Sequence, residues 1–395
     1  MAPASNHDLD LDPEIPGLFI RPDYYEVLAR LRAEAPVFEY QPNCWLVARH
    51  AEVREVSRDP ARFCSGRGVL MNDPLRAGGE IFGSVRHMDP PDHAPWRQLV
   101  SRSFTPRAMA RLEDRVRHHT RRVLDGAPED EEIDLVAEVA APIPVLVIAE
   151  LLDIPDADRS QFRRWSDATI EATDSAEPDL AAIGELHTFL MEHVRAHASD
   201  PGDDVVSALA TAEVDGHRVS SVEAAGYCLA LLVAGNETTR HLISGAARAL
   251  ADHPDQRRLL ATEPERIPVA VEECLRWVTP IQAFGRTATG DTELGGAHLA
   301  AGDWLVLLYA SANRDEAAFG ATAGEFDATR PVGNAHLAFG FGEHLCLGAA
   351  LARLEGRIVL EELLARYPEY RITGEPAWVR STLVRGMAAL PGRLT

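Results

Sequence analysis

Apolar side chains recur every three or four positions over most of the chain, the spacing that places them on one face of an α-helix. Charged and small polar residues fill the positions between them, so these segments are amphipathic. The pattern therefore predicts a mainly helical protein. The predicted helices cover 21–35, 89–101, 106–125, 134–152, 157–173, 179–198, 221–252 and 265–277, and a last one runs from the region of Cys346 to about residue 367.

Shorter stretches alternate between apolar and polar side chains, which is typical of strands. They predict a hairpin over 37–40 and 44–48, strands and turns over 283–309, and a small β tail. Residues 65–85 are rich in glycine and predict an irregular loop. Because no linker composition and no internal repeat divides the chain, we expect one domain over 1–395, mainly α with small β sheets. Residues 1–20 are expected to form an extended N-terminal arm.

Composition narrows the function classes. The net charge is −22, and all 39 basic residues are arginine. This acidic balance argues against a general nucleic-acid binder, which would present a basic face. The N-terminus lacks the basic and apolar regions of a signal peptide, and the longest apolar runs are far shorter than the roughly 20 residues of a membrane span. We expect a cytoplasmic protein without a membrane anchor.

The cysteines are scattered and form no C-x-x-C pair, so neither a disulfide framework nor a zinc site is predicted. One of the five, Cys346, stands in HLAFGFGEHLCLGAALARLE at 336–355, directly before a predicted helix. The free N–H groups of a helix N-terminus favour a thiolate and should lower the pKa of Cys346. Glycines at 340, 342 and 348 allow a flat ligand to approach the backbone, and Phe339 is placed to shield the sulfur.

Two interpretations of this loop stay open on chemistry alone. A soft, protected thiolate with no second cysteine nearby suits an axial haem ligand. A lone cysteine is also commonly a buried structural residue. A phosphate-binding loop is disfavoured, because the glycine spacing matches neither G-x-G-x-x-G nor the P-loop.

The long predicted helix carries a second group of chemical residues. Ser220 and Glu223 form a capping-box pattern at its start. At 1.5 Å per residue the helix spans about 45 Å, enough to cross the molecule. Its middle reads VAGNETTR, in which Gly235 favours a local distortion, the Thr238 hydroxyl can bond a backbone carbonyl or a water, and Glu237 offers a proton. The alternative is an ordinary helix that tolerates one glycine.

Two further pairs lie at helical spacing. In DPPDHAPWR (89–97), Asp89 is predicted as N-cap and Pro90 as a first-turn residue, and His93 and Arg97 share a face that suits an anionic group. The alternative for this pair is a solvated helix face. Glu273 and Arg276 are three residues apart, as in many exposed ion pairs.

The segment FGFGEHLCLG (339–348) resembles the haem-binding signature F-x-x-G-x-x-x-C-x-G of the cytochrome P450 family, and the other motifs follow in that family's order. The resemblance implies a P450-type domain with haem b between the long helix and the cysteine loop, and Cys346 as the axial iron ligand. It implies oxygen-activation roles for Thr238 and Glu237. The implied cofactor-binding residues are Phe339, Gly340, Gly348 and Ala234, with His93, Arg97, Arg286 and His344 on the propionates, and the implied structural network is Glu273, Arg276 and Arg330.

The resemblance also implies monooxygenation of a hydrophobic small molecule (a sterol, terpenoid, fatty acid or natural-product scaffold) with O2. Electrons would come from NAD(P)H through a ferredoxin reductase and a ferredoxin, which could dock on Arg102, Arg107 and Arg353; the alternative for these three is scattered surface arginines. Alternatives are a non-hydroxylation oxidation, a carrier-bound substrate, or a haem sensor without turnover. The implied pocket residues, for which core packing is the alternative, are Val69, Leu70, Leu231, Ala234, Ile281, Phe284 and Leu383.

Overall fold

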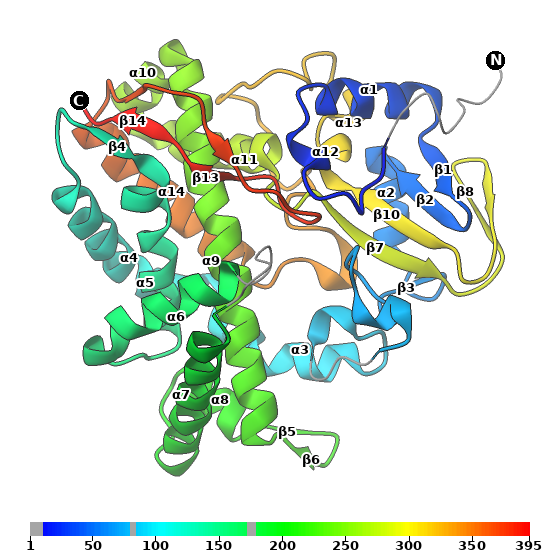
Figure 1. The fold of residues 1–395 in the computed structure, drawn as a ribbon, viewed down its shortest axis with the longest axis horizontal. Helices are drawn as coiled ribbons and strands as arrows, with labels where there is room; N and C mark the ends of the chain where they lie inside the picture. Colours follow the sequence, from blue (N-terminus) through cyan, green and yellow to red (C-terminus); the bar gives the residue numbers. More distant parts are fainter. Residues whose placement is uncertain (1–10, 80–83, 172–178) are drawn as a thin grey trace.

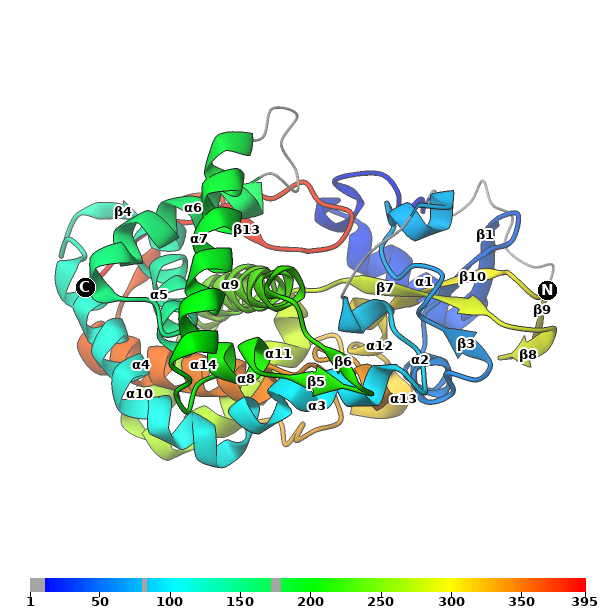
Figure 2. The same cartoon turned by 90° about the horizontal axis from the view of Figure 1, so that it is seen from below.

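The computed structural model describes residues 11–79, 84–171 and 179–395. A helical part and a smaller part that holds most of the strands meet beside one long helix, α9 (Ser221–Asp252) (Figure 1). Seen nearly end-on, α9 lies in the middle of the molecule (Figure 2). Its capping box forms as predicted, because Ser220 Oγ accepts from Glu223 N and Glu223 accepts from Ser220 N.

The predicted mainly α character is confirmed in the described ranges. Besides α9, the α-helices are α1 (Tyr24–Glu34), α2 (His50–Arg58), α3 (His93–Ser101), α4 (Pro106–Gly126), α5 (Pro142–Leu151), α6 (Arg159–Glu171), α7 (Leu180–Ser199), α8 (Val205–Ala210), α10 (Pro254–Thr262), α11 (Ile267–Val278), α12 (Tyr309–Ala312), α13 (Glu316–Phe319) and α14 (Ala349–Arg366).

The largest sheet has five strands in the order β1-β2-β10-β7-β3. The predicted hairpin forms its β1–β2 edge, and β10 pairs parallel with β2 and antiparallel with β7. The strands are β1 (Val37–Gln41), β2 (Cys44–Val47), β3 (Phe63–Cys64), β4 (Glu132–Asp134), β5 (Glu213–Val214), β6 (His217–Arg218), β7 (Ala283–Ala288), β8 (Thr292–Leu294), β9 (Ala297–Leu299), β10 (Trp304–Leu308), β11 (Arg371–Ile372), β12 (Ala377–Trp378), β13 (Met387–Ala389) and β14 (Pro391–Arg393).

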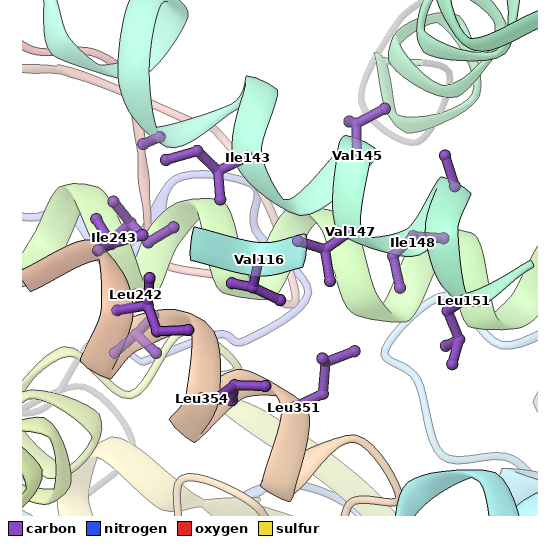
Figure 3. Packing of buried hydrophobic residues seen from close by; sticks show 14 of the residues in the cluster. Val116, Ile143, Val145, Val147, Ile148, Leu151, Leu242, Ile243, Leu351 and Leu354 are labelled. Carbon is purple, nitrogen blue, oxygen red and sulfur yellow. The ribbon is translucent and has the colours of Figure 1, made fainter. Parts of the chain in front are cut away.

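The main apolar core fixes α9 among its neighbours. Val116 of α4, Ile148 of α5, Leu242 of α9 and Leu354 of α14 belong to one buried cluster (Figure 3). Each such side chain contributes roughly 1.5–3 kcal/mol on full burial. Gly235 belongs to this packing, since a Cβ there would lie 2.5 Å from Ile148 Cδ1. The glycine in the middle of α9 therefore lets α5 approach closely.

Four sequence-based expectations are wrong in detail. The single helix predicted over 134–152 is instead β4, a π-helical turn (Val136–Ala140) and α5, because Asp134 accepts from Val136 N and Leu390 N and Pro142 starts a new helix. Helix α3 starts at His93, so Asp89 is not its N-cap. Helices α2, α8, α10, α12 and α13, strand β3 and the β5–β6 hairpin were not predicted.

The fourth concerns the N-terminal arm. Residues 1–10 of the predicted arm, like 80–83 of the predicted loop, lie outside the described residues. From residue 11 onward the arm is not extended. It forms turns and a 3-10 helix (Leu18–Ile20), because Leu18 and Phe19 are buried in the core around α1.

Candidate functional site

The loop before α14 presents the Cys346 side chain. Cys346 N donates to Phe339 O at 2.9 Å, and Leu345 N donates to Gly342 O at 3.1 Å. Gly340 and Gly342 have φ of 68° and 75°, in the region that favours glycine. A Cβ on Gly342 would lie 2.0 Å from Ser57 O at the end of α2. These contacts fold the loop tightly, and the Cys346 side chain is exposed.

The predicted lowering of the Cys346 pKa is wrong. Surrounding protein atoms raise the pKa of the thiol, and the opposing effects of the Gly348 N–H and of the Arg97 and Arg353 guanidiniums are smaller. Helix α14 begins only at Ala349, so its N-terminus acts weakly on the sulfur. A coordinated metal ion would remove the thiol proton in any case.

Phe339 of the cysteine loop packs against two side chains outside the loop's tip. Its ring lies 4.7 Å from the Arg353 guanidinium and 5.7 Å from the His336 ring. Both partners also bond Glu272, at 2.7 Å from Arg353 Nε and 3.0 Å from His336 Nε2. The ring is thereby fixed to α11, which carries Glu272.

The middle of α9 offers small side chains to solvent. Ala230 and Ala234 are exposed and Thr238 is half-buried, at a spacing of one turn each. The Thr238 hydroxyl donates to Ala234 O at 2.7 Å, the backbone bond that the sequence analysis anticipated. The helix itself is uninterrupted, so the distortion predicted at Gly235 is wrong. Glu237, in contrast, is only 8% exposed.

Four basic side chains from separate elements gather near the cysteine loop. His93 and Arg97 come from α3, Arg286 from β7, and His344 from the loop. The His93 and His344 rings are 4.4 Å apart, and Arg97 donates to Leu345 O. Burial and the charges of Arg286, His93 and Arg97 lower the pKa of His344 to about 3. His93 Nε2 is buried with no hydrogen-bond partner in the ranges that the structure describes.

This arrangement fits a haem. An exposed cysteine sulfur, a stripe of small side chains on the central helix, and two arginines with two histidine donors are what an iron, a flat macrocycle and two carboxylates need. Besides burial, the charges of Arg97 and Arg286 lower the pKa of His93 and His344, so an anion bound beside these groups would offset that repulsion. The sequence analysis named all four, and the structure brings them together.

The Glu273, Arg276 and Arg330 side chains form one buried network. Arg276 holds Glu273 through two bonds of 2.7 Å, and Arg330 Nε lies 3.4 Å from Glu273 Oε1. Arg276 also donates to the carbonyls of Asn313 and Ala323. The network therefore joins α11 to the segment that leads to the cysteine loop, unlike an exposed ion pair.

The predicted pocket residues come together in three places. Gly285 N donates to Val69 O, which sets Val69 and Leu70 beside Phe284 of β7. Gln282 N donates to Leu383 O, which joins Ile281 to the C-terminal segment. Leu231 and Ala234 lie on α9. Val69 is fully buried and the other six are at least partly accessible.

Among the docking candidates, Arg102 and Arg107 are exposed. Arg353 differs, because it is paired with Glu272 at 2.7 Å.

Comparison with known proteins decides the family. Residues 176–370 match the family model Cytochrome P450. The chain is 38% identical over 391 residues to the erythromycin C-12 hydroxylase of Saccharopolyspora erythraea, with 96% of each chain covered. It is 40% identical over 373 residues to the vitamin D(3) 25-hydroxylase of Pseudonocardia autotrophica, with 92% of each covered. A solved structure of a P450 EryK mutant in complex with erythromycin B gives a TM-score of 0.85 at 37% identity, covering 96% of this chain and 98% of that one.

The chain belongs to the cytochrome P450 family. The predicted family, P450 fold and enzyme class are thereby confirmed: this is a haem-iron monooxygenase, an oxidoreductase that uses O2, a hydrophobic substrate and redox partners. Its relatives are bacterial P450 hydroxylases of natural products, lipids and steroids. Among the helices described, none combines the length and hydropathy that a membrane span requires.

Sequence reasoning missed two polar partners of the P450 motif on α9. Asn236 Nδ2 donates to Ser166 Oγ of α6 at 2.9 Å, a contact between segments 70 residues apart that no local pattern reveals. His241 lies one turn after Glu237 and 3.8 Å from it. The i,i+4 spacing was a signal for this second pair.

Proposed function

We propose that this P450 contains haem b, receives electrons from NAD(P)H through a ferredoxin reductase and a ferredoxin, and hydroxylates or epoxidises a hydrophobic scaffold such as a macrolide, sterol, terpenoid or fatty acid. The observation that carries the proposal is the placement of an exposed Cys346 beside four gathered basic side chains. Relatives named for erythromycin, vitamin D(3) and methyl-branched lipids support a large apolar substrate.

The proposed roles follow from the geometry. Bound haem would supply the activation of O2. Cys346 would donate its thiolate to the iron, and His93, Arg97, Arg286 and His344 would hold the propionates. The buried Glu273 network would keep the loop in place. Phe339, Gly340, Gly348 and Ala234 would border the macrocycle, and the accessible pocket candidates would exclude water from the substrate.

Glu237 and Thr238 would transfer protons during the reaction. The Thr238 hydroxyl is half-buried and bonded to Ala234 O, so rotation about one side-chain bond frees it to donate elsewhere. Glu237 adjoins it in sequence and provides a carboxyl that can hold a proton inside the protein. A carboxyl and a hydroxyl at consecutive positions of α9 provide two groups that general acid catalysis can use.

The carbon monoxide difference spectrum of the reduced protein tests the cofactor site. We expect the strongly red-shifted Soret band of a thiolate-ligated haem for the wild type and for Cys44→Ser, whose cysteine lies in β2. Cys346→Ser is expected to lose this band. An unchanged band in Cys346→Ser, or no haem in the wild type, would overturn the proposal.

Substrate and partner need separate assays. Titration with a macrolide, a sterol and a branched fatty acid should give a substrate-induced Soret shift for one class, followed by a product one oxygen atom heavier. Turnover with a ferredoxin should fall when Arg102 and Arg107 are both changed to Glu, and the loss should shrink at high salt. Equal turnover with a flavodoxin as sole donor would contradict the ferredoxin assignment.

A further inference from the structure

His241 is a buried histidine one helical turn after Glu237, the proposed proton donor. His241 follows Glu237 by four residues on α9, so both side chains share one helix face. The imidazole is 0% exposed. Neither ring nitrogen has a hydrogen-bond partner within 11–79, 84–171 and 179–395. Nε2 lies 3.8 Å from Glu237 Oε1, a few tenths of an ångström beyond hydrogen-bond distance.

The other side of the ring is closed by backbone. A Cβ on Gly386 would lie 2.1 Å from Nδ1 and 2.2 Å from Cγ of His241, so the C-terminal segment packs directly on the imidazole. Val379 N donates a hydrogen bond to Gly386 O, and Arg385 N donates one to Pro280 O. These two bonds fix the C-terminal segment against the ring. The backbone therefore restricts movement of the His241 ring on this side, and the Glu237 carboxylate is the acceptor to which the ring can donate a hydrogen bond.

Charges around the ring favour its neutral form. Burial lowers the pKa of His241, and the charge of Arg240 adds to this, while Glu237 acts in the opposite direction. Arg385, on the C-terminal segment, is directed away, since its Nε donates to Phe19 O and its guanidinium lies 4.1 Å from the Trp378 ring. A neutral imidazole keeps one N–H, and Nε2 is the nitrogen that faces an acceptor.

We propose that His241 is a positioning residue that donates its Nε2–H to Glu237 and fixes the orientation of that carboxyl, which stands next to Thr238 in the sequence and delivers protons during O2 activation. This inference rests on the proton role of Glu237 proposed above. It explains why a polar ring is buried without another partner, a placement that costs free energy unless a hydrogen bond forms. His241 does not itself touch the substrate or the haem in this scheme.

Variants at 241 separate positioning from packing. His241→Leu fills the site without a donor, and His241→Gln keeps an N–H. We expect His241→Leu to divert NAD(P)H to hydrogen peroxide, with a severalfold lower product yield per NAD(P)H and a larger solvent isotope effect on turnover, and His241→Gln to recover most of the yield. His119→Leu is the matched control, because it removes a buried histidine 3.0 Å from Glu150, between α4 and α5. Equal losses in the Leu and Gln variants would show that only packing matters and would overturn the proposal.

A double-mutant comparison identifies the route. His241→Leu should lower the yield in the wild type but change nothing further in Glu237→Gln, because the histidine acts through that carboxyl. If Glu237→Gln alone leaves the yield unchanged, the proposed role of Glu237 is wrong. If Glu237→Gln lowers the yield and His241→Leu does not, the role of His241 alone is wrong.

A spectroscopic measurement tests the contact without turnover. In protein labelled with ¹⁵N-histidine, His241 should show a neutral imidazole with the proton on Nε2, and Glu237→Gln should shift that resonance. A proton on Nδ1, or a His241 resonance that does not shift in Glu237→Gln, would overturn the proposal. Should His241→Leu fail to fold, Gly386→Ala reaches the same ring from the other side, and a normal yield in that variant with a displaced His241 resonance would likewise count against it.

Discussion

Asn236 of α9 donates a hydrogen bond to Ser166 of α6 across 2.9 Å, and both side chains are almost completely buried. Asn236 stands within the same AGNETT segment as Glu237 and Thr238, so this bond ties the segment of α9 that carries the proposed chemistry to α6.

Ser166→Ala should destabilise the protein. The change leaves the Asn236 amide buried without its acceptor, which typically costs about 1–3 kcal/mol. Urea unfolding monitored by circular dichroism measures the free energy of unfolding. Thr188→Ala, which removes an exposed hydroxyl bonded within α7 to Gly184 O, is the control and should change little. Equal stability of Ser166→Ala and the wild type would show that the bond contributes nothing.

The buried carboxylate of Glu273 should be much more important than its helical spacing suggests. Glu273→Ala removes the partner of the fully buried Arg276 and leaves an uncompensated charge, which costs about 3–5 kcal/mol. We expect a large drop in melting temperature and a low yield of haem-loaded protein. Glu263→Ala breaks an exposed i,i+3 ion pair with Arg266 and should leave both quantities unchanged. Equal melting temperatures and equal yields of haem-loaded protein in the two variants would show that burial does not make the Glu273 ion pair more important.

Two glycines of the cysteine loop should respond in opposite ways to alanine. At Gly342 the φ of 75° and the 2.0 Å approach of Ser57 O forbid a Cβ, so Gly342→Ala should open the loop and lower the haem content. At Gly348 a Cβ would meet nothing nearer than Cys346 Sγ at 4.0 Å, and the backbone is ordinary. Gly348→Ala should therefore fold normally. The melting temperatures of both variants, measured by circular dichroism, check this contrast in folding.

The sequence predicted the helical core and the site residues for a physical reason: helical periodicity and motif spacing are local. It predicted the limits of α9 and the capping box at Ser220 because the capping signals lie within four residues. It failed where distant contacts decide. Asp134 is fixed by Leu390, Asp89 accepts from Ser65 and Gly66 instead of capping α3, and Gly235 serves the approach of Ile148. Arg353 was predicted as a candidate for the redox-partner docking patch, but Glu272 on another helix binds it.

Glu355 of α14 should make stability depend on pH. Its carboxyl is 1% exposed, and neither oxygen has a hydrogen-bond partner in the described part of the chain. Burial raises its pKa to about 8. A glutamate in the unfolded chain has a pKa of about 4.3. At pH values between this unfolded pKa and the folded pKa, the folded protein therefore keeps a proton that the unfolded chain has lost.

The sign follows from this difference. Because the folded state binds the proton more tightly, the free energy of unfolding falls as the pH rises through this window and levels off above the folded pKa. Each pKa unit corresponds to about 1.4 kcal/mol, so the full loss amounts to several kcal/mol. Glu355→Gln cannot ionise. It should match the wild type near the unfolded pKa and exceed it at pH values around 8 and above, as urea unfolding at several pH values would show.

Glu362, which follows Glu355 on α14, provides a control with the opposite pH dependence of stability. Burial acts to raise its pKa, but hydrogen bonds from Arg121 and Arg117 outweigh this and lower it. Glu362 therefore contributes stability that is present above its unfolded pKa and lost as the pH falls through the folded value. Glu362→Gln should lose stability at neutral pH, where Glu355→Gln gains or keeps it. If Glu355→Gln and the wild type show the same pH slope between the two pKa values, Glu355 must be solvated or paired in the folded protein.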